Sequence, residues 1–363
     1  MPESIDFSKR LAVFREAMTR AGDLDGVWVT NPTNMYYLSG FTGGTAGLLI
    51  TQEAAVVVTD SRYTEQARQE AAGYRIEQHG SPMWTTLKAL VDEFHLQRVG
   101  FEKQHLTYAA FEEMTQALAP VTLVPTQGLV EDLRAIKDPG EIARVAAAVA
   151  LADEGFTHIL SFIRPGVSER DIDVELEFFL RRRGATAMAF PSIVASGPRG
   201  ALPHGEATDR LVQPGEFLTL DFGVILDRYC SDMTRTVAVG QITSEQRKVY
   251  DTVLQAQLAG IAAVAAGKTG REVDAAARDL IVAAGYGQYF GHGLGHGVGL
   301  NVHDAGPRLA PTEQKVLPVG AVVTVEPGIY IPGWGGVRIE DIVVVEAGGA
   351  RVLTRSPKEL IQI

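Results

Sequence analysis

Two aspartates flank a short polar turn within the apolar segment 217–240. A Leu-Asp-Arg break at residues 226–228 separates two β-rich arms, which predicts an antiparallel hairpin. If the turn is centred after the leucine of this break, Asp221 lies directly opposite Asp232, with the two Cβ atoms roughly 5 Å apart. Carboxylates at that distance repel each other unless a cation lies between them or one keeps its proton. The pattern favours a metal site.

A second pair of carboxylates flanks another turn, in segment 322–345. Glu326 and Glu340 are equally far from Gly333 in a proline- and glycine-rich turn, so a hairpin centred there places them opposite each other. Acids on a solvated strand face are common, but both pairs lie within apolar segments that we expect to be buried. Because an unpaired buried carboxylate is costly, the two hairpins together indicate ligands rather than surface charge.

Three histidines, His292, His296 and His303, lie among glycines in residues 291–304. Glycine lets a backbone or a ligand approach closely, since it has no Cβ atom. A single histidine in such a segment is more often a hydrogen-bonded core residue than a ligand. Three within twelve residues, in a chain that also has two acidic hairpins, favour a functional site.

Four carboxylates and one neutral imidazole suit two divalent cations, whose charge they balance, with room for a bridging water. Ligation dominated by oxygen, with one histidine, favours manganese or cobalt over a thiolate zinc site. Two ions about 3.5–4 Å apart can activate the bridging water and polarise a carbonyl group. These residues therefore predict hydrolysis of an amide bond.

The elements that position these residues belong to two predicted domains. From a helix at residues 7–21 onward, short β-type runs alternate with helical periodicity, which predicts a small α/β domain at 1–125. In the second domain, 126–363, long helices precede a strand-rich last third. Its first helix begins at residues 138–141 (Asp-Pro-Gly-Glu), with proline in the first turn and an acid at the positive end of the dipole. The fold class is α/β (α+β). Further helices are predicted at residues 62–72, 84–95, 107–118, 168–183, 243–266 and 270–284.

The composition of the chain bears on which classes of partner and which cellular location we expect. The 363-residue chain has a net charge of −11 and a pI near 5.3, which argues against nucleic acid as a partner. No apolar run approaches the roughly 20 residues that span a bilayer. The N-terminal residues lack the basic region and the apolar run of a signal peptide. Cys230 is the single cysteine, so no intrachain disulfide forms. We expect a cytoplasmic protein that binds neither nucleic acid nor membrane.

Several motifs of the chain occur together in a known family. They are PHG, DFG…SDMTRT, GHGLGHGVGL…VHD, VEPGIY and RIED. With them the chain resembles the Xaa-Pro peptidase family with the pita-bread fold, which includes prolidase and aminopeptidase P. The resemblance extends to NPTNMYYLSGFTG (31–43) in the N-terminal domain and to LRAIKDPGEI (133–142) at the join between domains. It implies a creatinase-like N-terminal α/β domain followed by a pita-bread catalytic domain.

The resemblance also implies a ligand set for two divalent ions per chain. The matching residues are Asp221, Asp232, His296, Glu326 and Glu340. In the family, the residues that match Asp232 and Glu340 bridge the two ions, and the one that matches Glu326 serves as the general base. Mn²⁺ is the expected ion, with Co²⁺ or Zn²⁺ as alternatives.

Residues for the substrate follow from the same matching. His204 and His303 would contact the substrate and stabilise the developing oxyanion, and His292 would line the same pocket. Arg338 is two residues before Glu340 and therefore faces the same side of the strand, so it either braces the acid cluster or binds a substrate carboxylate. Arg199 stands where relatives often carry asparagine, which leaves the shape of the substrate-side loop open.

The expected activity is hydrolysis of the bond between an N-terminal residue and proline, in a homodimer. The short chain slightly favours a dipeptidase, and the alternative is an aminopeptidase P that acts on longer proline-containing peptides. Creatine amidinohydrolase shares the architecture but works without metal, and methionine aminopeptidases usually lack a comparable N-terminal domain. A catalytically silent relative that binds peptides would typically have lost ligands, whereas all five matching residues are present.

Overall fold

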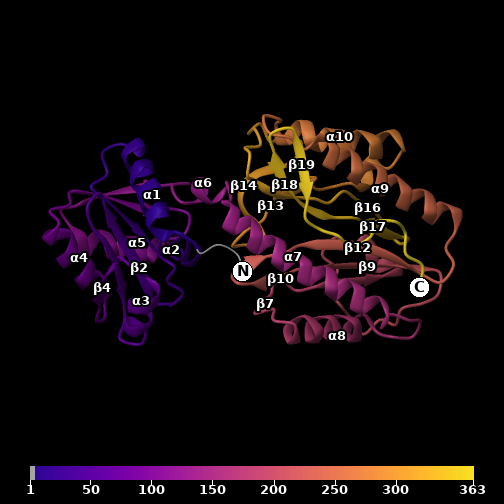
Figure 1. The fold of residues 1–363 in the computed structure, drawn as a ribbon, viewed down its shortest axis with the longest axis horizontal. Coiled ribbons are helices and arrows are strands. Elements are labelled where there is room, and N and C mark those ends of the chain that lie inside the picture. Colours follow the sequence, from indigo (N-terminus) through magenta and orange to yellow (C-terminus); the bar gives the residue numbers. More distant parts are fainter. Residues whose placement is uncertain (1–4) are drawn as a thin grey trace. The chain divides into compact units, whose positions relative to one another are not determined.

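The computed structural model describes residues 5–363, and its internal contacts divide the chain between Leu133 and Arg134 into two compact units. In Figure 1 the N-terminal unit runs from indigo to purple, and the C-terminal unit from magenta to yellow. Each unit has a hydrophobic core of its own.

The N-terminal unit is built on a mixed six-stranded sheet in the order β4-β3-β2-β1-β5-β6. The central strand β1 pairs antiparallel with β2 and parallel with β5. The strands are β1 (Gly26–Val29), β2 (Ala46–Thr51), β3 (Ala55–Thr59), β4 (Arg75–Gln78), β5 (Arg98–Glu102) and β6 (Thr122–Thr126). The helices are α1 (Phe7–Ala21), α2 (Pro32–Ser39), α3 (Thr64–Glu70), α4 (Trp84–Glu93) and α5 (Tyr108–Leu118), and α6 (Glu131–Arg134) ends at the division.

Helix α2 is missing from the sequence-based assignment. Its start follows known rules, because the Asn31 side chain accepts hydrogen bonds from the backbone N–H groups of Thr33 and Asn34, and Pro32 occupies the first turn. The helix ends at Gly40, which takes a left-handed conformation with φ of 78°. A helix this short has too little apolar periodicity to be recognised from the sequence, although Asn31 and Gly40 are residue types typical of helix ends.

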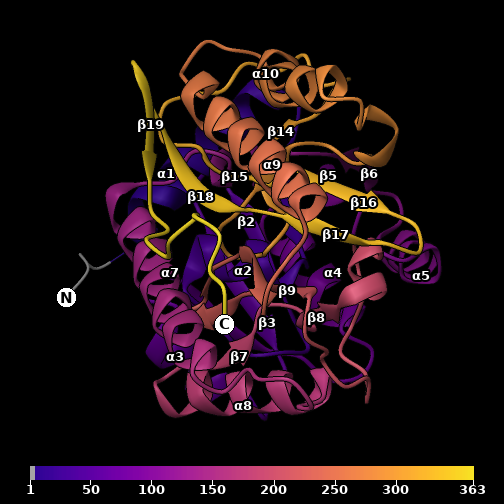
Figure 2. The ribbon, with the colours of Figure 1, turned by 90° about the vertical axis from the view of Figure 1, so that its right-hand side faces the viewer.

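Two helix pairs enclose the strands of the C-terminal unit (Figure 1, Figure 2). They are α7 (Pro139–Leu160) with α8 (Glu169–Arg182), and α9 (Ser244–Ala263) with α10 (Gly270–Ala283). Helices α7, α9 and α10 each begin with a capping box, in which the N-cap side chain and the side chain three residues later satisfy each other's backbone N–H groups. Each helix pair buries its apolar face against strands, so the unit has two hydrophobic clusters with the sheets between them.

The strands of this unit form several small sheets. One has the order β12-β9-β8, another β11-β10-β7, and a five-stranded sheet has the order β14-β13-β15-β18-β19. Their bounds are β7 (Ala187–Met188), β8 (Ile193–Ser196), β9 (Glu216–Phe222), β10 (Val224–Leu226), β11 (Tyr229–Cys230), β12 (Met233–Val239), β13 (Gly295–Gly297), β14 (Asp304–Leu309), β15 (Val322–Val325), β16 (Gly328–Ile331), β17 (Gly335–Arg338), β18 (Asp341–Glu346) and β19 (Gly349–Val352). Two short 3₁₀ helices are η1 (Gly197–Ala201) and η2 (Gly287–Tyr289). Within residues 5–363, no helix has both the length and the apolar character needed to cross a membrane.

The first acidic hairpin forms, but its predicted register is wrong. Asp221 lies opposite Thr234, not opposite Asp232. The turn is centred one residue later than expected, because Asp227 and Arg228 both take positive φ angles, 46° and 71°, as the central residues of a type I′ turn do. This shift changes the pairing by two positions, so the side chains keep their predicted face. Asp232 therefore still lines the same cavity as Asp221.

The second acidic hairpin has the predicted register. Ile329 lies opposite Val337 in the β16–β17 ladder, and Val325 lies opposite Asp341 in the β15–β18 ladder. Both ladders turn about Gly333, which has a φ of 75°. The two ladders therefore continue the same pairing on either side of the two glutamates.

At the glutamates themselves, the backbone pairs with segments outside the hairpin. The N–H of Glu326 donates to Leu294 O at 2.8 Å, and the N–H of Glu340 donates to Thr234 O at 3.1 Å. These bonds tie the second hairpin to the histidine segment on one side and to the first hairpin on the other. The site residues are thus fixed by backbone pairing between hairpins as well as within them.

Gly223 separates β9 from β10 at the point where the chain passes from one sheet to the next. A Cβ atom added to Gly223 would lie 2.0 Å from Ser231 O, which requires the backbone to move. We expect Gly223→Ala to destabilise the protein by about 1–3 kcal/mol through overpacking. The measurement is urea unfolding of the metal-free protein. Gly348→Ala is the matched control, because a Cβ at Gly348 meets no atom within 4 Å. Equal stability of the two variants would contradict the prediction.

Candidate metal centre

A cavity of about 860 Å³ in the C-terminal unit contains every site residue predicted from the sequence. It lies where the two acidic hairpins meet the histidine segment and the loop before β9. The predicted residues that line it are His204, Asp221, Asp232, His292, His296, His303, Glu326, Arg338 and Glu340. The structure thus brings these nine side chains together, and the role of each remains a prediction.

Three of these side chains form a group with the dimensions of a metal site. One ligand atom each from Asp232, His296 and Glu340 lies within 4.8 Å of the other two. His296 Nε2 is 3.5 Å from Asp232 Oδ2 and 3.3 Å from Glu326 Oε1. A donor set of carboxylates and one imidazole, converging on one point, suits a divalent first-row cation.

Asp221 supplies an independent test of this fit. Its Oδ2 accepts a hydrogen bond from Arg338 Nη2 at 2.6 Å. Its Oδ1 is buried and has no hydrogen-bond partner within the described part of the chain. Because a buried carboxylate oxygen without a donor is costly, a cation would satisfy Asp221 where the protein supplies nothing.

The protonation of the group also depends on a cation. Burial, then the charges of Glu340 and Asp221, raises the pKa of Asp232 well above its usual range. Burial, then the charge of Glu326, does the same to the pKa of Glu340. Burial lowers the pKa of His296, so its imidazole is neutral at pH 7, as a metal ligand must be. A divalent cation bound among these groups would favour the ionised carboxylates and so oppose the upward shifts of their pKa values.

Arg338 braces the acid cluster. Its guanidinium donates to Asp221 Oδ2, to Thr234 Oγ1 at 3.0 Å and to Tyr330 OH at 2.8 Å, and its side chain is 4% exposed. The sequence left two roles open for this residue. With its Nε and both terminal nitrogens engaged in the protein, the geometry favours bracing over binding a substrate carboxylate.

Two threonine hydroxyls orient the glutamates. Thr234 Oγ1 donates to Glu340 Oε2 at 2.7 Å, and Thr324 Oγ1 donates to Glu326 Oε1 at 3.1 Å. Thr324 Oγ1 also accepts from the backbone N–H of His296 at 3.0 Å. The sequence analysis missed both threonines. Their signal is the two-residue spacing of a strand, since Thr324 is two residues before Glu326 and therefore shares its face.

The other histidines lie around this group. His303 stacks on His296 with ring centroids 3.7 Å apart, and burial together with the neighbouring histidines lowers the pKa of His303 to about 4. His292 Nε2 lies 2.8 Å from Tyr330 OH, the same hydroxyl that accepts from Arg338. His204 is exposed on the loop that leads to β9. These imidazoles line the cavity together with the carboxylates.

Comparison with known sequences identifies the architecture. Residues 10–136 match the creatinase/prolidase N-terminal domain, and residues 143–347 match metallopeptidase family M24. The chain belongs to metallopeptidase family M24. This confirms the predicted fold class, in which a creatinase-like domain precedes a pita-bread catalytic domain, and the family implies divalent metal ions.

Individual relatives are similar over almost their full length. A solved Xaa-Pro dipeptidase from Bacillus anthracis is 48% identical with a TM-score of 0.96, covering 99% of this chain and 100% of that one. A solved X-Pro aminopeptidase from Thermotoga maritima is 36% identical with a TM-score of 0.89, covering 95% and 99%. The sequence of the Xaa-Pro dipeptidase from Pyrococcus horikoshii is 36% identical over 93% of this chain and 95% of its own length.

Metal binding should stabilise the protein, and more so at higher pH. The carboxyl pKa values of Asp232 and Glu340 are raised above their unfolded values, 3.8 and 4.5, so the metal-free protein loses stability as pH rises through the raised values. A bound cation removes this penalty. It also adds about 2.7 kcal/mol to the free energy of unfolding when its free concentration is 100 times its dissociation constant. We expect Mn²⁺ to raise the melting temperature of chelator-treated protein, with a larger increment at pH 8 than at pH 5.

The control for this measurement is Asp232→Asn, which removes one charge from the group. Its melting temperature should respond less to Mn²⁺ than that of the wild type. A wild-type melting temperature that stays unchanged on adding Mn²⁺, Co²⁺ or Zn²⁺ would contradict the metal centre.

Proposed function

We propose that this protein hydrolyses the peptide bond between an N-terminal residue and proline, using water activated by two divalent metal ions. The observation that carries the proposal is the convergence of two carboxylate pairs and a histidine on one cavity, with a buried Asp221 oxygen that lacks a donor. Relatives named Xaa-Pro dipeptidase and X-Pro aminopeptidase, similar over nearly the whole chain, support the substrate class. Mn²⁺ is the proposed ion, with Co²⁺ or Zn²⁺ as alternatives.

Five residues are assigned to the ions: Asp221, Asp232, His296, Glu326 and Glu340. Asp232 and Glu340 are assigned as bridging ligands, and the proximity of their ligand atoms, which lie within 4.8 Å of each other, supports this assignment. Bound divalent ions lower the pKa of water and polarise a carbonyl oxygen. The protein's own part is to hold the ligands in register, which the hairpin pairings and the braces on Asp221 and Glu340 provide.

Glu326 is assigned the proton transfer. It lies in the cavity beside His296, and burial raises its pKa toward the range where a general base works near neutral pH. The carboxylate takes a proton from the attacking water and delivers it to the proline nitrogen. That nitrogen must be protonated to leave, because an amide anion is a poor leaving group.

His204 and His303 are assigned to the carbonyl oxygen. Negative charge develops there during attack, and donors held near that oxygen stabilise it more in the transition state than in the bound substrate. The stack of His303 on His296 holds one of the two rings beside the metal group. His292 is assigned to the substrate pocket, where Tyr330 fixes the ring through its hydroxyl.

The apolar part of the cavity suits a proline ring. Phe190, Pro191, Ile193 and Val302 line it together with the histidines. A peptide bond to proline has no N–H and its ring is rigid, so recognition must come from shape and apolar contact rather than from a hydrogen bond to that nitrogen. The lining supplies such a surface.

Arg308 is a site residue that the sequence analysis missed. It and Arg338 are the cations among the lining residues of the described cavity, and Arg338 is committed to the acid cluster. The Arg308 side chain is 66% exposed and its Nε is 3.9 Å from Glu313 Oε2, so its guanidinium remains accessible. A free carboxylate directly after proline would find its counter-ion here. This favours the dipeptidase over the aminopeptidase P alternative, which is retained for longer peptides.

Three further expectations are proposals that rest on the resemblance and the composition. They are a homodimer, a cytoplasmic location, and an N-terminal domain at 1–125 that precedes the catalytic domain at 126–363. Analytical ultracentrifugation tests the first of these directly.

Glu326→Gln should abolish most turnover while the binding of an unreactive Xaa-Pro analogue weakens far less. Glutamine keeps the shape of the side chain but cannot take the proton. The measurement compares the rate of Xaa-Pro hydrolysis with analogue affinity in a sample whose two ions are verified by elemental analysis. Glu346→Gln, at an exposed position of β18, is the control. Near wild-type turnover of Glu326→Gln with both ions present would assign the proton transfer to another group.

Arg308→Met should raise KM for an Xaa-Pro dipeptide by about 10-fold to 100-fold, as expected for loss of a charged hydrogen bond. An Xaa-Pro-Yaa-Yaa peptide, which has no carboxylate at that position, should be affected much less. Arg351→Met, on the exposed strand β19, is the control. Equal losses on both substrates would exclude a carboxylate contact. Hydrolysis of neither substrate by the metal-loaded wild type would instead favour a silent peptide-binding relative.

A further inference from the structure

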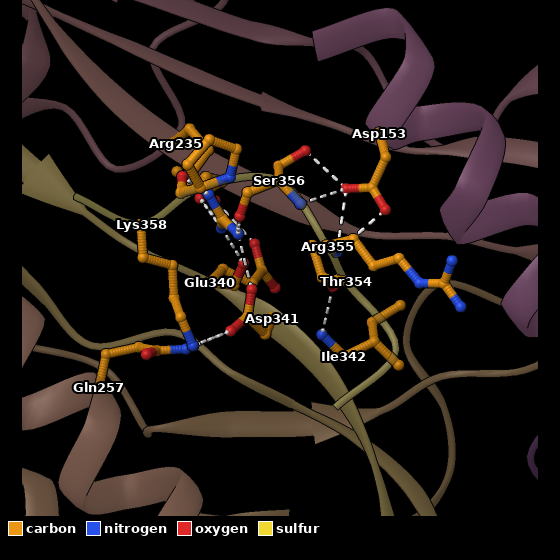
Figure 3. Close-up of polar contacts among 12 residues, drawn as sticks. Asp153, Arg235, Gln257, Glu340, Asp341, Ile342, Thr354, Arg355, Ser356 and Lys358 are labelled. Carbon is orange, nitrogen blue, oxygen red and sulfur yellow. Dashed lines mark hydrogen bonds and ion pairs between the residues drawn. The ribbon is translucent and has the colours of Figure 1, made fainter. Parts of the chain in front are cut away.

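Arg235 lies next to Asp341 and to Glu340, which is one of the proposed metal ligands (Figure 3). It follows Thr234 on β12, just as Asp341 follows Glu340 at the start of β18. Neighbouring residues on a strand point to opposite faces. The side chain of Glu340, which lines the cavity, therefore meets that of Thr234 on one face, while the side chains of Arg235 and Asp341 meet on the opposite face, at 2.7 Å.

The guanidinium of Arg235 is fully satisfied and its residue is 1% exposed. An arginine side chain carries five N–H donors, and here there are five acceptors at 2.5–2.9 Å. The acceptors are Asp341 Oδ1 and the carbonyl oxygens of Thr234, Glu340, Ser356 and Pro357. One side chain thus holds the backbones of Thr234 and Glu340 together with a segment from the end of the chain.

The second oxygen of Asp341 extends this network. Asp341 Oδ2 accepts from Gln257 Nε2 of α9 at 2.9 Å and from Lys358 Nζ at 2.7 Å. The segment 354–358, which we call the C-terminal strap, is also held by Asp153 of α7, which accepts from the backbone N–H of Ser356 at 2.8 Å. The network is thereby joined to α9 through Asp341 and to α7 through the strap (Figure 3).

We infer that Arg235, Asp341 and the C-terminal strap position Glu340 as a bridging ligand and so set the affinity of the site for its metal. The inference rests on the proposed metal site and goes beyond it, because none of these side chains is among the residues that line the cavity. The carbonyl of Glu340 is held by Arg235 and its carboxylate by Thr234, so the residue is fixed at both ends.

Lysine cannot replace Arg235 in this role. An ammonium group has the same charge but is a point donor with three N–H groups, whereas the planar guanidinium binds Asp341 and four carbonyl groups at once. Arg235→Lys should therefore keep the charge balance of the buried pair while releasing the Glu340 backbone. Residues that orient metal ligands from outside typically change metal affinity by about 10-fold to 100-fold when substituted.

The experiment is equilibrium dialysis of chelator-treated protein against Mn²⁺, with thermal unfolding of the same samples. We expect Arg235→Lys to weaken Mn²⁺ binding by about 10-fold to 100-fold. Lys358→Met, at a position 22% exposed and thus tolerant of change, should weaken it by a smaller factor. If Arg235→Lys does not fold, the Mn²⁺ affinity of the double variant Lys358→Met/Asp153→Asn, which weakens only the contacts of the strap, tests the inference instead.

Arg199→Met is the matched control. It breaks another pair between an arginine and a buried acid, Glu169, but contacts no proposed ligand. Its Mn²⁺ affinity should equal that of the wild type, whatever happens to its melting temperature. Unchanged Mn²⁺ affinity in the Arg235 and Lys358 variants, or an equal loss in the control, would overturn the inference. Because no substrate is used, this outcome is separate from any failure of Xaa-Pro hydrolysis.

Discussion

The burial of like charges around one cavity is the constraint on which the C-terminal unit depends. Glu340 is 2% exposed, and three other carboxylates share its surroundings. Burying even a paired charge is expensive, and carboxylates that lack a counter-ion must bind protons instead. Within residues 5–363, the side chains that donate hydrogen bonds to these carboxylates are one guanidinium, that of Arg338, and two hydroxyl groups, those of Thr234 and Thr324. That is too little for four negative charges, so the arrangement is stable as an anionic site only with cations bound.

The protein accommodates this constraint by placing rigid supports outside the cavity. An ion pair between a buried acid and an arginine holds each segment that carries a site histidine. The Asp341–Arg235 pair holds the strand of Glu340 in the same way. Arg278 donates to the carbonyl of His292, and Asp304, directly after His303, accepts from the backbone N–H of Leu300 across the loop. The pairs are Asp274–Arg278, Asp304–Arg134 and Glu169–Arg199. Glycine-rich segments, which allow close approach of a ligand, thus obtain their rigidity from neighbouring ion pairs.

Two-residue periodicity assigned the four acids to faces that line one cavity, because alternate residues of a strand share a face, whereas His204 was added by the resemblance to the peptidase family. The register about Gly333 followed from a turn that is symmetric in sequence. The register about Asp227 could not be predicted in this way. Asp227 and Arg228 both adopt positive φ angles, which aspartate and arginine do less often than glycine, so the residue types did not indicate where the turn is centred. Contacts such as those of Arg235 with distant carbonyl groups escape any local pattern, because their partners are backbone atoms brought together only by the complete fold.

The proposed ligands come from two hairpins and a histidine segment that are far apart in the chain. A partly folded chain therefore presents no complete binding site, and forming one requires long-range strand pairing first. Metal then interacts mainly with structure that forms after the folding barrier, so we expect it to slow unfolding more than it accelerates folding. Stopped-flow measurements with and without Mn²⁺ would show this in the unfolding arm. For such a protein, the lifetime of the native state is set by metal supply, while the speed of its formation is set by topology.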